Sequence, residues 1–117
     1  MHAVVKIYHN PRCSKSRQTL QLIRDNGIEP EIVLYLDTSL TPDDIQSLIQ
    51  MLGLPSARDL MRRGEAIYKD LDLKKETDEN ALIKAMAAYP KLIERPIVIH
   101  KGKAVLGRPP ENILDII

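Results

Sequence analysis

Short apolar runs and a helix-spaced segment alternate along the first 36 residues. Ala3–Tyr8 is rich in β-branched residues and predicts a strand, which Asn10-Pro11 ends. Apolar residues recur at helical spacing in Ser14–Asn26, and the apolar run Glu31–Leu36 predicts a second, buried strand. Strand–helix–strand units of this length pair their strands in parallel, so we expect a parallel βαβ unit.

Helical patterns dominate the middle of the chain. Thr41-Pro42-Asp43-Asp44 has the cap, the proline and the acidic residues of a helix start, and that helix should reach Leu52. Ser56 is expected to cap a short helix through Arg63, which Gly64 ends. A third helix should start at Thr77 or Asp78 and stop before Pro90.

Two strands and a helix are predicted for the last part of the chain. Pro96–His100 and Lys103–Leu106 are apolar runs joined by Lys101-Gly102, a two-residue hairpin turn. Pro109-Pro110 should open a final helix whose apolar part is Asn112–Ile117. The order β-α-β, helices, β-β-α predicts an α/β, thioredoxin-like fold with a small mixed sheet. We expect one domain over residues 1–117, with a helical insertion at about 40–94.

Composition and charge narrow the range of functions. No apolar run approaches the roughly 20 residues of a membrane span, and the start lacks the basic and apolar regions of a secretory signal, so a cytoplasmic protein is expected. The 17 basic and 16 acidic residues leave a net charge of +1, which argues against nucleic acid as a partner. We expect a monomer, although the sequence carries no signal of oligomeric state.

Cys13 is the candidate for chemistry. As the one cysteine of the chain, it cannot form an internal disulfide or a zinc site of several thiolates, and we expect no metal. It lies between the first strand and the first helix, where unpaired N–H groups and the helix dipole favour a thiolate. Arg12, Arg17 and the nearby His9 add positive charge, so this loop is a candidate anion site.

The alternative reading is that Cys13 is an inert, small apolar residue, as single cysteines often are. Its place in a basic polar loop favours reactivity instead. Ser16 stands where a C-x-x-C redox motif would have its second cysteine, so the partner thiol must come from another molecule.

The segment Tyr8–Leu20, YHNPRCSKSRQTL, closely resembles the active-site loop and first helix of the ArsC-type arsenate reductases that depend on glutathione and glutaredoxin. Three further segments resemble those in which that family carries substrate-binding arginines. These fall on Arg62 in SARDLMR, Arg95 in ERPIV and Arg108 in GRP. The similarity extends over essentially the whole chain.

The resemblance implies a glutaredoxin-dependent arsenate reductase without a tightly bound cofactor. Cys13 would attack arsenate to give a thiol–arsenate adduct, glutathione would be the co-substrate, and His9 would help to keep Cys13 ionised. Arg12, Ser16 and Arg17 would complete the anion loop. Two alternatives stay open: a non-catalytic regulator like the Spx proteins, which bind RNA polymerase, and a general glutathione-linked thiol reductase.

Overall fold

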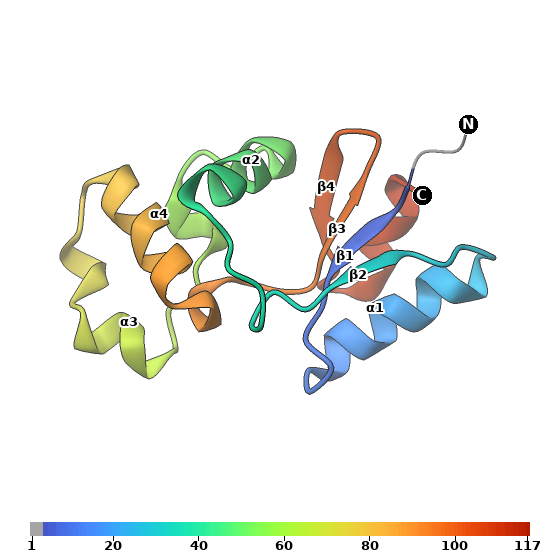
Figure 1. The fold of residues 1–117 in the computed structure, drawn as a ribbon, viewed down its shortest axis with the longest axis horizontal. Coiled ribbons are helices and arrows are strands. Elements are labelled where there is room, and N and C mark those ends of the chain that lie inside the picture. The colour runs from blue at the N-terminus through green and yellow to red at the C-terminus, as the bar shows by residue number, and fades with distance from the viewer. Residues whose placement is uncertain (1–3) are drawn as a thin grey trace. The chain divides into compact units, whose positions relative to one another are not determined.

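A computed structural model describes residues 4–117 of the chain. These residues form two compact units (Figure 1). The sheet unit consists of the described residues up to Thr38 together with Arg95–Ile117, and the helical unit is Ser39–Glu94. The expectation that the chain folds as one domain concerns cooperativity of folding and stays a prediction.

The sheet unit is built on four short strands. They are β1 (Lys6–Tyr8), β2 (Glu31–Val33), β3 (Ile97–His100) and β4 (Lys103–Leu106). Their order is β2-β1-β3-β4, with β1 parallel to β2 and antiparallel to β3, and β3 antiparallel to β4. The parallel βαβ unit, the mixed sheet and the α/β class predicted from the sequence are confirmed. The predicted first strand starts later than expected, and its first residue, Ala3, lies outside the described residues.

Two helices contact each other and pack against the sheet. The α-helix α1 spans Ser14–Asp25, and the 3₁₀-helix η4 spans Pro110–Asp115. The predicted final helix is thus of the 3₁₀ type. Pro109 is its N-cap and Pro110 its first residue, so the two prolines open it as expected. The core between helices and sheet contains five buried apolar residues: Val5, Ile7, Ile23, Val98 and Ile113.

The second predicted strand is shorter and less buried than expected. It ends at Val33 because the carbonyl oxygen of Leu34 accepts hydrogen bonds from Asp37 N and Thr38 Oγ1, both at 2.9 Å, and so closes a turn. β2 is an edge strand of the sheet, and Leu34 and Leu36 beyond it are each 40% exposed. An apolar run alone does not distinguish such an edge segment from a buried strand.

The hairpin between β3 and β4 has the predicted two-residue turn. Lys101 has φ 53° and Gly102 has φ 75°. Positive φ at both central residues is the backbone of a type I′ turn, whose twist matches that of the flanking strands. The turn therefore fixes the register in which His100 pairs with Lys103.

The helical unit contains the first and the third of the three helices predicted for the middle of the chain. α2 spans Pro42–Leu52, and Thr41 and Asp44 form a reciprocal capping box at its start. α4 spans Glu79–Ala88, and the Asp78 side chain accepts a hydrogen bond from Asn80 N. Both caps match the sequence expectation.

The predicted helix from Ser56 to Arg63 is wrong in its extent. Ser56 does cap a helix, but this is a single 3₁₀ turn, η1 (Ala57–Leu60), because Met61 is extended and pairs with Ile93. Three further short helices follow in this unit: α3 (Ala66–Asp70), η2 (Leu73–Lys75) and η3 (Pro90–Leu92).

Candidate active site

Cys13 is the N-cap residue of α1. Its backbone is extended, with φ −96° and ψ 124°, and its side chain makes no capping hydrogen bond. Its N–H donates to the carbonyl oxygen of Asn10 at 3.0 Å, and its own carbonyl accepts from Arg17 N at 3.0 Å. The backbone of the loop therefore holds the partly exposed sulfur at the end of the helix where N–H groups are unpaired.

A buried hydrogen-bond chain underlies this loop. Ser16 is fully buried, and its Oγ lies 2.6 Å from His9 Nδ1 and accepts a hydrogen bond from Asn10 N at 3.0 Å. The chain is satisfied when the Ser16 hydroxyl donates to His9 Nδ1, which places the imidazole proton on Nε2. Ser16 thus joins the end of β1 to the first turn of α1.

Arg95 and Arg108 meet within the sheet unit. Arg108 Nη1 donates to the carbonyl oxygen of Arg95 at 3.3 Å. Each arginine is followed by a proline, and both the Arg95-Pro96 and the Arg108-Pro109 peptide bonds are cis. Gly107 N donates to the carbonyl oxygen of Pro96 at 2.9 Å. The start of β3 and the end of β4 are thereby tied together at the two arginines.

Gly107 is where this arginine segment contacts α1. Thr19 is fully buried, and its hydroxyl lies 3.3 Å from the Gly107 carbonyl oxygen and 2.8 Å from that of Lys15. A Cβ atom at position 107 would lie 2.6 Å from Thr19 Oγ1 and 2.9 Å from Pro96 Cγ. Only glycine allows this close approach, which places Arg108 beside the helix that begins at Cys13.

Several groups act on the acidity of Cys13. Partial burial is the largest single influence and would raise the pKa of the thiol. The N–H of Ser16 and the Arg95 guanidinium act in the opposite direction, followed by the N–H of Lys15 and the charge of Arg108. Together they bring the pKa of Cys13 below its ordinary value. The loop thus stabilises a thiolate.

The surroundings of His9 disfavour its charged form. Burial lowers the pKa of His9 below its ordinary value, and the positive charges of Arg24 and Arg17 lower it further. A neutral imidazole does not attract a thiolate through charge. The contact of His9 in this site is the hydrogen bond to Ser16, whose N–H stabilises the Cys13 sulfur.

Arg12 and Arg17 contact the loop itself. Arg17 Nη1 donates to the carbonyl oxygen of Pro11 at 3.0 Å, and the N–H of Arg12 donates to Asn10 Oδ1 at 3.0 Å. Both arginines are exposed. Neither is among the groups that lower the pKa of Cys13. Their hydrogen bonds instead stabilise the conformation of the loop.

Arg62, the third predicted arginine, lies in the helical unit. Its guanidinium forms an ion pair with Glu65, and its Nε lies 3.7 Å from Glu94 Oε1. Its N–H donates to the carbonyl oxygen of Leu92 at 2.7 Å. Arg62 follows the extended Met61 rather than ending a helix, and two carboxylates offset its charge.

Sequence reasoning missed the residues that shape the site without reacting. Asn10 appeared only as a turn signal, yet its backbone and side chain make three hydrogen bonds in the loop. The sequence around Thr19 gives no sign of its contact with Gly107, 88 positions further along the chain. A glycine directly before the predicted arginine was the available signal for a close approach.

In the described part of the chain, no three His, Cys, Asp or Glu side chains are grouped so that they could bind a metal ion. Over the same residues, none of the helices has the length and apolar character needed to cross a lipid bilayer.

Known proteins similar to this chain identify its family. The family model for ArsC matches residues 8–116. The chain belongs to the ArsC family. It is 56% identical to the Escherichia coli K12 protein YfgD over 97% of this chain and 96% of that protein. It is 49% identical to an arsenate reductase of Neisseria meningitidis serogroup A, over 93% and 94% of the two chains.

A solved ArsC structure has nearly the same fold. The arsenate reductase from Vibrio cholerae superimposes with a TM-score of 0.96 at 48% identity, covering 100% of both chains. The match covers the residues of both the sheet unit and the helical unit. The predicted family and the thioredoxin-like fold are confirmed.

Proposed function

We propose that this protein is an arsenate reductase that uses glutathione and glutaredoxin, with Cys13 as its nucleophile. The observation that carries the proposal is the environment of Cys13, whose pKa is lowered by backbone N–H groups and by Arg95 and Arg108. A nucleophilic thiolate beside two guanidinium groups suits attack on a tetrahedral oxyanion. Relatives named arsenate reductase, such as that of Neisseria meningitidis, support the choice of arsenate.

In the first step, the Cys13 thiolate attacks the arsenic atom of arsenate. An S–As bond forms, and an oxygen leaves as hydroxide, which takes up a proton to become water. Guanidinium groups are planar, stay charged and can donate two parallel hydrogen bonds to an oxyanion. Arg95 and Arg108 would therefore offset the negative charge of arsenate as a second anion approaches it.

In the second step, a glutathione thiolate attacks the sulfur of the adduct. An S–S bond forms, the S–As bond breaks, and its electron pair remains on arsenic, which leaves as arsenite. The two electrons thus come from two thiols, one of Cys13 and one of glutathione. Because Ser16 replaces the second cysteine of a C-x-x-C motif, a glutaredoxin thiol would then resolve the mixed disulfide.

A coupled assay tests this proposal. Purified protein is mixed with arsenate, glutathione, glutaredoxin, glutathione reductase and NADPH, and NADPH consumption is followed. We expect turnover that requires both arsenate and glutaredoxin and that is lost in Cys13→Ser, while Ser14→Ala keeps it. Arsenate-dependent turnover that persists in Cys13→Ser would refute the assignment.

The same preparation distinguishes the two alternatives from the sequence. A general glutathione-linked reductase would reduce a glutathionylated protein substrate without arsenate, and arsenate would not protect Cys13 from alkylation. A regulator like the Spx proteins would be recovered with RNA polymerase in a pull-down. Spx-type proteins carry a C-x-x-C switch, and Ser16 removes that switch here.

A further inference from the structure

The helical unit contains a cavity that the proposed chemistry does not use. Its volume is about 470 Å³, and six residues line it: Arg58, Arg63, Tyr68, Lys69, Asp72 and Lys74. Four of the six carry positive charge and one carries negative charge. The size falls within the range of small-molecule sites, which is roughly 300–1,000 Å³.

The charge of Arg58 is not neutralised within the protein. Its Nη1 donates to Tyr68 Oη at 2.6 Å and to the carbonyl oxygen of Leu73 at 2.9 Å, and its Nη2 donates to the carbonyl oxygen of Glu76. All three acceptors are neutral. Over residues 4–117, Arg58 takes part in no ion pair, so a half-buried guanidinium adds its full charge to the cavity.

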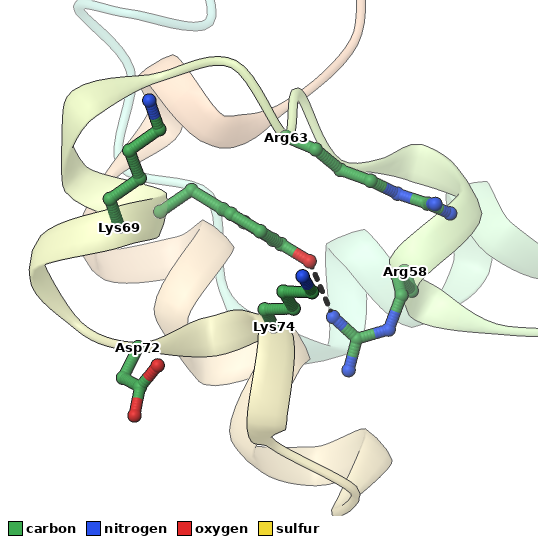
Figure 2. Close-up of a pocket in the computed structure, with 6 residues that line it drawn as sticks. Arg58, Arg63, Lys69, Asp72 and Lys74 are labelled. Atoms are coloured by element: carbon green, nitrogen blue, oxygen red, sulfur yellow. Dashed lines mark hydrogen bonds between the residues drawn. The ribbon is translucent and has the colours of Figure 1, made fainter.

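The carboxylates near the cavity do little to offset this charge. Asp72 Oδ2 lies 3.8 Å from Lys75 Nζ, and Figure 2 draws no hydrogen bond between the Asp72 carboxylate and Arg58. Asp59 Oδ1 lies 3.6 Å from Nη2 of the exposed Arg63, which is too long for a strong hydrogen bond. An incoming anion could therefore recruit Arg63 without breaking a strong ion pair.

Tyr68 adds a hydrogen-bond donor to the cations. It is 6% exposed, and its hydroxyl oxygen accepts from Arg58. Among the described residues no acceptor is found for its own proton, which leaves that proton for a ligand oxygen. Guanidinium, ammonium and hydroxyl donors together are the groups that bind phosphate oxygens.

We propose that this cavity binds the phosphate groups of a small phosphorylated organic molecule, as a site distinct from the Cys13 loop. Inorganic phosphate and a phosphate ester could each form ion pairs with the arginine and lysine side chains that line the cavity. A single phosphate would occupy only a small part of about 470 Å³, whereas an ester places an organic group in the remaining space. A concave site of this size also favours a small molecule over an acidic protein segment, which would seek a longer charged surface.

The two lysines provide the test. Arg58 bonds to Leu73 and Glu76, so its replacement would disturb the fold of the unit. Lys69 and Lys74 are exposed, and in the described residues neither side chain makes a hydrogen bond or an ion pair. The Lys69→Gln/Lys74→Gln double variant should therefore fold normally. The matched control is Lys84→Gln/Lys91→Gln, which removes two exposed charges elsewhere in the same unit.

The experiment is an NMR titration of the full chain with ADP, with adenosine and with a glutamate-rich peptide, at 150 mM salt. We expect ADP to shift the backbone amides of residues 58–76 and adenosine to leave them unchanged. ADP binding should weaken about tenfold or more in the lysine pair variant, since each charged contact contributes a sizeable share of affinity. The control pair should keep its affinity.

Three results would overturn the proposal. ADP shifts confined to residues 9–16 and 107–109 would place binding at the Cys13 loop. Equal ADP affinity in the two double variants would show that Lys69 and Lys74 are not ligands. Binding of the peptide at residues 58–76 without binding of ADP would identify a protein-docking surface instead.

Discussion

At the scale of single residues, the anion at Cys13 depends on donors from two sources. The N–H groups of Ser16 and Lys15 come from the helix that Cys13 begins, while Arg95 and Arg108 come from the other end of the chain. The backbone donors are fixed by the helix itself, so side-chain changes leave them in place. Substitutions of Arg95 and Arg108 are therefore the way to change the pKa of Cys13.

Removing Arg95 should make Cys13 a weaker acid. In Arg95→Gln, the pH midpoint of Cys13 alkylation by iodoacetamide should move upward, because a positive charge that favours the thiolate is lost. Arg108→Gln should move it in the same direction by less. Lys103→Gln, an exposed charge on the β3–β4 hairpin, is the control. An unchanged midpoint in Arg95→Gln would contradict this account of the thiolate.

Ser16 should matter for stability through its hydroxyl. Ser16→Ala leaves the buried His9 Nδ1 and the Asn10 N–H without their partner. We expect the free energy of unfolding to fall by about 1–3 kcal/mol, as measured by urea denaturation. Ser14→Ala changes an exposed residue on the same helix and should stay within about 0.5 kcal/mol of the wild type. Equal losses in the two variants would show that the buried chain is not what holds the loop.

At the scale of elements, local signals predicted most of the fold correctly. The caps at Thr41 and Asp78 and the turn at Lys101-Gly102 were readable because each depends on residues close in sequence. The exposure of β2 was not, since the sheet order that places β2 at an edge depends on strands far apart in the sequence. Met61 likewise leaves the helical pattern because of Ile93, more than thirty residues away.

The candidate site divides in the same way. Cys13 and the motif around it could be found from the sequence, because a loop and a helix start give a local signal. The family resemblance gave Arg95 and Arg108 as candidates for substrate binding. That Arg108 bonds to the carbonyl oxygen of Arg95 could not be derived from their spacing. The lowered pKa of His9 depends on its burial and on the nearness of Arg24, neither of which can be read from the sequence.

The contact between α1 and the end of β4 should be sensitive to one methyl group. In Gly107→Ala, the new Cβ would lie 2.6 Å from Thr19 Oγ1, so the helix or the arginine segment must shift. We expect a loss of about 1–3 kcal/mol in unfolding free energy, measured by urea denaturation, together with lower activity.

A second glycine provides the comparison for that variant. Gly64→Ala meets no atom within 4 Å, so stability should stay the same or rise by up to about 1 kcal/mol. A Gly107→Ala protein as stable as Gly64→Ala would show that the approach of Thr19 is not tight.

At the scale of the whole molecule, the groups that set the acidity of Cys13 all belong to the sheet unit. Arg62 belongs to the helical unit, where Glu65 and Glu94 hold its side chain. The family resemblance assigns Arg62 to the substrate, and that role stays a prediction. This role can be tested separately from the acidity of Cys13. A contact to the substrate affects kcat/KM for arsenate, whereas a charge that stabilises the thiolate affects the pH profile of Cys13 alkylation.

Arg62→Gln should lower kcat/KM for arsenate by about tenfold or more, since a charge-assisted contact to the oxyanion is lost. The pH profile of Cys13 alkylation should remain that of the wild type, because Arg62 is not among the groups that shift its pKa. Lys84→Gln is the control for loss of one positive charge in the helical unit. Normal kcat/KM in Arg62→Gln would remove this arginine from the mechanism.

The two outer strands of the sheet have a consequence for how the protein behaves when concentrated. β2 has three residues and β4 has four, and they begin with Glu31 and Lys103 respectively. Short edge strands that carry charged side chains are poor templates for an added strand from another molecule. Concentrated samples should therefore resist fibril growth and edge-to-edge aggregation during storage, even though Ile32 exposes an apolar side chain on the edge strand β2.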